Sequence, residues 1–358
     1  MIIGIDSSRA NKAQKTGTEW YSFFIIQELK KIGVKHQFRL YTNTLLEPAL
    51  AACPENFEQR VLHWPLKYLW TQKRLSWEML LHPPDVLFVP AHTIPIFCRA
   101  KTVVTIHDVG FAAQPQLYPF HEKLYHRASA WFAVHFADRI ICPTEFTKRE
   151  LIKFYHADPA KIAVIPHGVE VPKNIESTKW NRPYLLYMGR VEQKKNIMNL
   201  LEAYALVHMK HQDLRLILAG RLGFGGKECV AWVNSQGLGQ SVEFTGSIIE
   251  DRKWSLYRGA LALVFATLYE GFGLPLLEAQ AVGCPVVTSD LPAHREVAQE
   301  AAVYVDPASP QSIAQGIERA SDPGVAQNLG KLGRLNAANF TWSKTAASTL
   351  GVLESLGR

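Results

Sequence analysis

The chain has 358 residues, of which 47% are hydrophobic and 20% are charged, and its formal net charge is +7. This length suits two domains of ordinary size, and the composition is that of a globular protein rather than a disordered or fibrous one. No apolar run approaches the roughly 20 residues that span a bilayer, and no basic leader that would mark a signal peptide is expected at the start. The five cysteines are scattered and form no CxxC pair, which favours a reduced cytoplasm over a disulfide framework or a cysteine zinc site.

The charge is unevenly distributed along the chain. Residues 1–172 contain 20 Lys and Arg against 15 Asp and Glu, whereas the remainder contains 19 against 17. A mildly basic first half is compatible with an anionic membrane surface, a nucleic acid or an anionic substrate. It is equally compatible with a basic isoelectric point that has no specific meaning.

The first half alternates short apolar runs with amphipathic stretches, a pattern typical of βαβ units. A helix is expected over residues 18–31, where large apolar side chains recur with helical spacing. Thr144 is predicted to be the N-cap of another helix that runs to about Tyr155. The apolar runs predict strands at residues 2–5, 37–41, 59–62, 86–89, 102–106, 139–142 and 162–165.

The second half repeats this pattern, with strands expected at residues 184–187, 215–219, 242–244, 261–266, 285–288 and 303–305. Between the halves, residues 166–183 are rich in proline and polar residues without a hydrophobic period, as in a linker. We therefore expect an α/β protein with two Rossmann-like domains, whose sheets present their carboxyl ends to a central cleft. The first domain would span residues 1–168, the linker 169–182 and the second domain 183–342.

A glycine turn between an apolar run and a helix carries the strongest chemical signal. The first amides of a helix point outward with the positive end of its dipole and bind anions, and glycine lets a ligand approach the backbone. Two carboxylates, Glu270 and Glu278, flank the turn and could accept hydrogen bonds from sugar hydroxyls. The same pattern also occurs where acidic residues merely favour the first turn of a helix. The turn consists of Gly271, Phe272, Gly273 and Leu274.

Four further candidates follow or precede expected strands. His107 comes directly after residues 102–106, where an imidazole could bind a hydroxyl or manage a proton, although most histidines are structural. Arg190 and Lys195 follow the first strand of the second domain, and either could bind phosphate oxygens unless they form a solvated charged face. Gly17 precedes the first helix and could equally be a plain helix start.

The spacing of these motifs resembles a known family. Glu270 and Glu278, separated by the seven residues GFGLPLL, resemble the paired-glutamate motif of the retaining family 4, or group 1, glycosyltransferases, which have the GT-B fold. Residues 104–108, ending in His-Asp, and the order of Arg190 and Lys195 are similar as well. Residues 165–169 resemble the family's linker motif, with His167 in place of its asparagine, and residues 340–346 resemble its terminal signature.

The resemblance implies a role for each candidate. Gly17, Arg190, Lys195 and the turn residues would hold the donor diphosphate and sugar, while the backbone near Ile248 and the Glu278 carboxylate would hold the nucleoside. Glu270 and His107 would be the catalytic residues that position the sugar and the acceptor. In the family's usual mechanism the acceptor attacks from the face that the nucleotide leaves, and the departing phosphate takes its proton. A terminal helix, here near residues 343–358, packs back on the first domain.

The resemblance implies transfer of a hexose from GDP-mannose or a UDP-sugar to a glycan or lipid-linked acceptor in polysaccharide assembly. No Asp-x-Asp occurs, so a metal-bridged donor site is not expected. The nucleotide sugar would be a co-substrate, and no cofactor is expected. The alternatives are a sugar-nucleotide epimerase of the same fold and a non-enzymatic polyanion- or membrane-binding protein; nucleic acid is not the expected partner. The basic and aromatic residues 66–77 suggest either peripheral contact with the inner face of the membrane or a helix packed on the first sheet.

Overall fold

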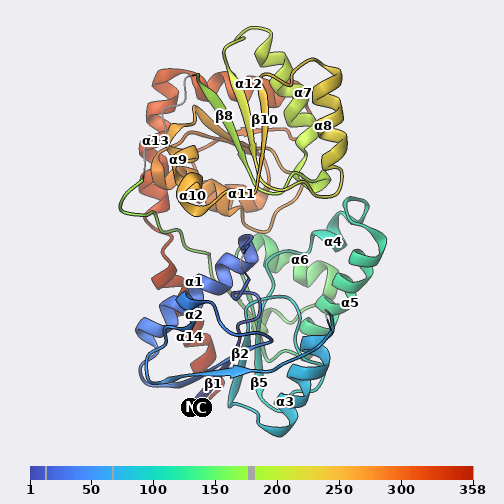
Figure 1. Cartoon of the computed structure of the whole chain (residues 1–358), viewed down its shortest axis with the longest axis vertical. Helices are drawn as coiled ribbons and strands as arrows, with labels where there is room; N and C mark the ends of the chain where they lie inside the picture. The colour runs from blue at the N-terminus through green and yellow to red at the C-terminus, as the bar shows by residue number, and fades with distance from the viewer. Residues whose placement is uncertain (13, 67, 176–181, 358) are drawn as a thin grey trace. The chain divides into compact units, whose positions relative to one another are not determined.

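A computed structural model describes residues 1–12, 14–66, 68–175 and 182–357. It divides the chain into two compact units, which are described separately (Figure 1). The first unit comprises Met1–Gly168 and Trp342–Arg358, and the second comprises Val169–Thr341. Each unit contains its own hydrophobic core between a parallel sheet and the helices on its two faces.

The first unit is built on a seven-stranded sheet in the order β3-β2-β1-β4-β5-β6-β7, in which every strand pair is parallel. This sheet confirms the expected alternation. The largest shift is in the third strand, which begins at Phe57 and not at residue 59, and the fifth strand is shifted by one residue. The central strands are buried on both faces, which explains why they are continuous apolar runs. The strands are β1 (Ile2–Asp6), β2 (Gln37–Thr42), β3 (Phe57–Val61), β4 (Val86–Val89), β5 (Lys101–Thr105), β6 (Arg139–Cys142) and β7 (Ile162–Val164).

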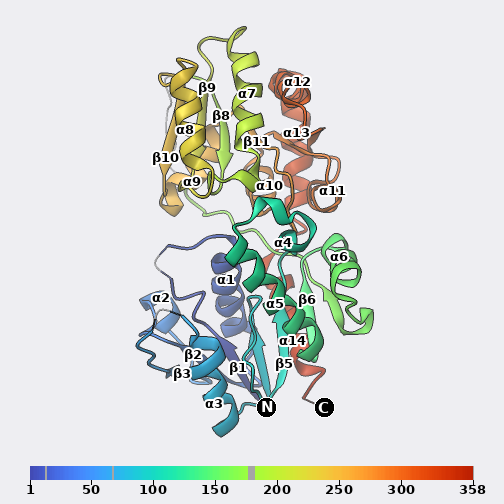
Figure 2. The same ribbon diagram turned by 90° about the vertical axis from the view of Figure 1, so that its right-hand side faces the viewer.

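Right-handed crossovers divide the helices of this unit between the two faces of the sheet. The crossovers from β1 to β2 and from β3 to β4 run in opposite directions, so α1 and α3 cover opposite faces (Figures 1 and 2). The C-terminal helix α14 packs on α1, where Phe24 and Trp342 stack with ring centroids 5.0 Å apart. The helices are α1 (Gly17–Ile32), α2 (Pro48–Ala51), η1 (Trp70–Leu75), α3 (Ser76–Leu81), α4 (Gly110–Ala113), η2 (Pro115–Leu117), α5 (Phe120–Phe136), α6 (Glu145–Tyr155), η3 (Pro159–Lys161) and α14 (Trp342–Glu354).

The second unit has a six-stranded parallel sheet in the order β10-β9-β8-β11-β12-β13. Its strands are β8 (Tyr184–Met188), β9 (Arg215–Ala219), β10 (Val242–Gly246), β11 (Ala262–Phe265), β12 (Val286–Ser289) and β13 (Val303–Val305). Its helices are η4 (Gln193–Lys195), α7 (Ile197–His208), α8 (Gly226–Ser235), α9 (Glu250–Gly259), α10 (Leu274–Val282), α11 (Pro292–Ala298), α12 (Pro310–Ser321) and α13 (Pro323–Ala337).

The segment expected to be a linker is partly packed. The backbone amide of Val169 donates to the carbonyl of Phe340 at 3.0 Å, and Val171 and Ile175 lie against the core of the second unit. Residues 169–175 therefore belong to that unit, while residues 176–181 of the expected linker lie outside the described residues. No helix in the described part of the chain is long and apolar enough to cross a membrane.

Candidate active site

The glycine turn expected between a strand and a helix is present in the second unit. It follows β11, and Gly273 is the N-cap of α10 with φ 93°, a left-handed conformation that glycine adopts without strain. A side chain at this position would also meet Leu276, with a Cβ only 3.0 Å from its Cδ1. The first turn of α10 thus presents its backbone at the carboxyl edge of the sheet, where an anion is stabilised by the helix dipole.

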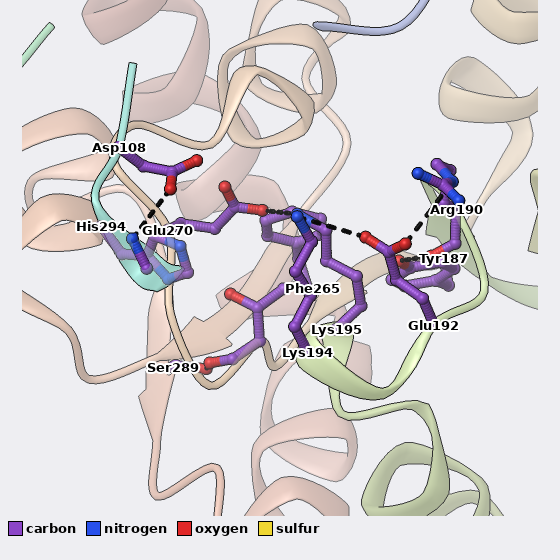
Figure 3. Close-up of polar contacts among 12 residues, drawn as sticks. Asp108, Tyr187, Arg190, Glu192, Lys194, Lys195, Phe265, Glu270, Ser289 and His294 are labelled. Atoms are coloured by element: carbon purple, nitrogen blue, oxygen red, sulfur yellow. Dashed lines mark hydrogen bonds and ion pairs between the residues drawn. The ribbon is translucent and has the colours of Figure 1, made fainter. Parts of the chain in front are cut away.

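Lys195 and Glu270 lie together at this turn, although 75 residues separate them in the sequence. Lys195 ends η4 in the connection after β8, and Glu270 lies in the connection after β11; β8 and β11 are neighbours in the sheet. The Lys195 ammonium forms an ion pair with Glu270 Oε1, and each side chain is only 15% exposed (Figure 3). A phosphate that binds Lys195 must therefore compete with the Glu270 carboxylate.

Arg190 is engaged with a carboxylate as well. Its Nε lies 3.5 Å from Glu192 Oε2, and Lys194 Nζ lies 3.4 Å from Glu192 Oε1. The Tyr187 hydroxyl donates to the Arg190 carbonyl at 2.8 Å and so fixes the backbone of this connection (Figure 3). Burial, and secondarily the negative charges of Glu270 and Glu192, raise the pKa of Tyr187. Tyr187 is therefore a neutral hydrogen-bond donor.

Glu278 occupies a different environment from Glu270. Its Oε1 is 2.8 Å from Lys253 Nζ, and its Oε2 accepts a hydrogen bond from the Tyr257 hydroxyl at 2.7 Å. Burial by itself would lower the pKa of Lys253, but the carboxylates of Glu278 and Glu250 outweigh burial and the pKa is raised. The expected nucleoside-binding glutamate is thus held by two residues of α9, and sequence reasoning missed both.

Ile248, the other expected nucleoside contact, lies in the short connection between β10 and α9 and is packed partly against the core. The same helix, α9, begins directly after this connection and carries the two partners of Glu278. Ile248 and Glu278 therefore adjoin the same helix, as a site that binds one nucleoside would require.

His294 is a further polar residue at this site that the sequence did not single out. It is fully buried on α11. The Thr288 hydroxyl donates its hydrogen to the Phe265 carbonyl at 3.0 Å. The same hydroxyl therefore accepts from His294 Nδ1, which lies 2.8 Å away. Its Nε2 has no partner among the described residues. Burial lowers the pKa of His294 to about 3. A polar residue on the buried face of a helix was the available signal, and it was overlooked.

In the first unit, Gly17 is the first residue of α1. The Glu19 side chain accepts a hydrogen bond from the Thr16 amide at 3.1 Å, as in a capping box, and it also lies 3.4 Å from Lys12 Nζ. The geometry is that of a well-formed helix start. The proposed contact of Gly17 with a donor stays a prediction.

His107 lies in a buried cluster of histidines at the carboxyl edge of the first sheet. Its Nε2 is 3.1 Å from the Pro90 carbonyl, and its Nδ1 is 3.2 Å from His167 Nε2. Because a carbonyl only accepts, Nε2 of His107 carries the proton and Nδ1 accepts from His167. Burial lowers the pKa of both His107 and His167, so the pair is neutral near pH 7. His92 packs edge-on against His107, with ring centroids 5.4 Å apart.

These contacts bear on the expected catalytic role of His107. Both of its ring nitrogens are engaged within the first unit, so the imidazole could contact a substrate only after exchanging one partner. The catalytic role stays a prediction. No group of three or more His, Cys, Asp or Glu side chains among the described residues has an arrangement that could hold a metal ion.

Two family profiles match the chain. The family described as "Glycosyl transferases group 1" matches residues 146–335, and "Glycosyltransferase Family 4" matches residues 16–172. Over 313 residues the chain is 26% identical to the O-antigen chain mannosyltransferase B of Escherichia coli, covering 83% of this chain and 79% of that protein.

Solved structures of the same fold match nearly the whole chain. Sucrose-phosphate synthase from Thermosynechococcus elongatus has a TM-score of 0.78 at 19% identity, with 99% of each chain covered. Anabaena HepE in complex with UDP and glucose has a TM-score of 0.75 at 18% identity, again with 99% of each chain covered. These likenesses confirm the expected fold, GT-B, with its two Rossmann-like domains.

Proposed function

The chain belongs to the group 1 glycosyltransferases, and we propose that it is a retaining hexosyltransferase that uses GDP-mannose or a UDP-sugar. The proposed acceptor is a glycan or a lipid-linked oligosaccharide, and the proposed location is the cytoplasm, with peripheral contact at the inner face of the membrane. Support for mannose comes from the mannosyltransferase relative, and support for a nucleoside diphosphate comes from the structural neighbour that holds UDP and glucose.

The observation that carries the proposal is the Lys195–Glu270 ion pair at the glycine turn before α10. Departure of a nucleoside diphosphate builds negative charge on the leaving phosphate, and Lys195, Arg190 and the first amides of α10 would stabilise that charge. Glu270, released from Lys195 by the phosphate, would accept hydrogen bonds from the sugar hydroxyls. One ion pair thus supplies both a phosphate ligand and a sugar ligand when the donor binds.

The second glutamate would serve the other end of the donor. Glu278 is held from α9 by Lys253 and Tyr257, and its carboxylate would accept hydrogen bonds from the ribose. We infer that no metal is needed, because cationic side chains and helix amides suffice to balance a diphosphate.

The experiment is a transfer and hydrolysis assay with a panel of UDP-, GDP- and ADP-sugars. We expect turnover with at least one donor and a loss of at least about 10-fold in Lys195→Ala, Glu270→Ala and His107→Ala, equivalent to about 1.4 kcal/mol of transition-state stabilisation. The proposed site is wrong if none of the three variants loses activity. Analysis of the sugar product without acceptor separates transfer from epimerisation.

A further inference from the structure

The net charge of the chain resides in the first unit. Residues 1–168 and 342–358 contain 22 Lys and Arg against 15 Asp and Glu, whereas residues 169–341 contain 17 of each. The second unit, with the candidate donor residues, is therefore neutral overall, and the first unit carries the entire excess of +7. A positive excess confined to one unit attracts an anionic surface to that unit.

The same unit exposes large apolar side chains that a soluble core would bury. Singly exposed apolar residues are ordinary, but a group of aromatic residues on one surface marks an interaction site. We define the aromatic face by five large apolar residues, four of them aromatic, with these exposed fractions: Trp77 (60%), Leu81 (53%), Phe97 (61%), Trp131 (50%) and Phe136 (60%).

Topology places these five residues on one side and near one edge of the first sheet. The helices α3 and α5 and the segment before β5 all belong to crossovers that run in the same direction, so they cover the same sheet face. Each of the three also leads into the start of a parallel strand, β4, β5 or β6. The aromatic face thus lies toward the amino edge of the sheet, opposite the carboxyl edge that bears His107.

Hydrogen bonds connect the parts of this face. The Phe97 amide donates to Ser76 Oγ at 3.3 Å, which ties the segment before β5 to α3. On the other side, Asp138 accepts from the Thr102 amide at 2.9 Å and from Lys101 Nζ at 3.0 Å, which ties β5 to the end of α5. Both figures show α3 and α5 as helices of the first unit (Figures 1 and 2).

Basic residues accompany the aromatic ones. Arg99 and Arg127 are exposed on the segment before β5 and on α5, and Lys73 is exposed on η1, which runs directly into α3. Within the described part of the chain none of the three is in an ion pair. The neighbouring acids are already neutralised: Glu78 lies 3.2 Å from Arg74, and Asp138 lies 3.0 Å from Lys101. The surface therefore combines unbalanced positive charge with exposed aromatic rings, the composition of an interfacial membrane-binding surface.

We propose that the aromatic face of the first unit binds an anionic lipid bilayer. A bilayer accommodates aromatic rings at the depth of its headgroups and pairs its anionic lipids with the adjacent cations. A nucleic acid or an acidic polysaccharide would pair with the cations but would not bury Leu81 or Phe136. A second copy of the chain suits it less, because each copy would bring a first unit with a net charge of +7 to the contact. The proposal rests on the membrane contact of the proposed function and assigns it to a surface, but it does not depend on which donor the second unit binds.

The test is cosedimentation of the full-length protein with vesicles of phosphatidylglycerol and phosphatidylcholine, compared with phosphatidylcholine alone. We expect binding to the anionic vesicles that weakens as salt is raised. The double variant Phe97→Ser/Trp131→Ser should bind at least about 10-fold more weakly, and Lys73→Ala/Arg99→Ala should weaken binding and reduce its salt dependence. A matched control, Phe224→Ser/Leu335→Ser, removes apolar residues that are 55% and 62% exposed on the neutral second unit and should bind as the wild type does.

Two outcomes would overturn the proposal. In one, the wild type stays in the supernatant with anionic vesicles. In the other, the aromatic double variant, shown to be folded by its thermal unfolding, sediments as well as the wild type; binding to heparin would then identify a general polyanion surface. Turnover of a soluble donor without vesicles should be equal in wild type and double variant, so a failure of lipid binding and a failure of the transferase assay are distinguishable.

Discussion

The ion pair between Lys195 and Glu270 predicts that one substitution will change nucleotide binding and turnover in opposite directions. Glu270→Gln keeps the size of the side chain but removes its charge. Lys195 is then released from its ion pair, and an incoming diphosphate no longer meets a nearby carboxylate. We therefore expect tighter binding of the bare nucleoside diphosphate together with slower sugar transfer.

The magnitude follows from the burial of the pair. Both side chains are only 15% exposed, so an effective dielectric constant of about 20 applies, and two unit charges about 8 Å apart then interact by about 2 kcal/mol. Glu270→Gln removes this repulsion between the carboxylate and the diphosphate, and part of the gain is lost when Lys195 rearranges. Diphosphate binding should therefore strengthen by about 1–2 kcal/mol, or about 5- to 30-fold. Turnover should fall at least about 10-fold, because the amide no longer accepts strong hydrogen bonds from the sugar hydroxyls.

The assay is isothermal titration calorimetry with UDP and GDP, alongside steady-state turnover with the preferred donor. Glu318→Gln is the matched control, since it removes the acid of a surface Lys–Glu pair whose Nζ–Oε1 distance is 2.7 Å, and it should change neither quantity. If Glu270→Gln binds the preferred nucleoside diphosphate no more tightly than the wild type does, the proposed exchange of partners at Lys195 is refuted.

Three further predictions concern buried polar contacts. His167→Ala leaves His107 Nδ1 without its donor and should lower the unfolding free energy by about 1–3 kcal/mol in urea denaturation, whereas His167→Asn, which can donate, should lose less. Tyr257→Phe removes a hydrogen bond to the Glu278 carboxylate and should cost about 1.5–3 kcal/mol in the same measurement. Burial lowers the pKa of His294 to about 3, so the unfolded state, with a pKa of about 6.5, binds the proton first. This residue should therefore reduce stability by about 2 kcal/mol as the pH falls from about 6.5 to about 5, and His294→Leu should lack that loss.

Each of these predictions has a result that contradicts it. Equal stability of His167→Ala and the wild type would show that the fold does not depend on the hydrogen bond from His167 to His107. An unchanged midpoint in Tyr257→Phe would mean that Lys253 alone holds Glu278. A pH dependence in His294→Leu that matches the wild type would show that His294 is already accessible to protons in the folded state.

Much of the fold could be predicted from the sequence because parallel strands buried on both faces leave continuous apolar runs. The N-cap at Thr144 was also readable, and its side chain does accept a hydrogen bond from the Thr147 amide. The third strand was misplaced by two residues because its solvent-facing side chains break the apolar run. Residues 169–175 looked like a linker because prolines and polar residues hide the few apolar side chains that pack against the second core.

The candidate site was less predictable, since partners of charged groups depend on tertiary contacts. The sequence placed Lys195 and Glu270 at the same edge of one sheet, but it could not show that they neutralise one another. Lys253 and Tyr257 are four residues apart on one face of α9, a spacing that is common on helices and points to no particular partner. His294 resembled any other residue of a short helix, and only the fold shows that it is buried next to the glycine turn.

The contacts of these residues indicate how the candidate site handles charge. Lys195 and Arg190 each lie against a carboxylate, and Lys253 lies against two. His294 is kept neutral by burial, as is His107 in the first unit. These ion pairs leave the site nearly balanced in charge, so it does not attract every anion as an uncompensated cluster of cations would. In the proposed binding mode, a diphosphate would replace the carboxylates as the partner of the cations, and the released carboxylates would accept hydrogen bonds from hydroxyl groups instead. Because a nucleotide sugar supplies phosphates and hydroxyls in one molecule, we propose that this balance of charge favours a nucleotide sugar over free phosphate.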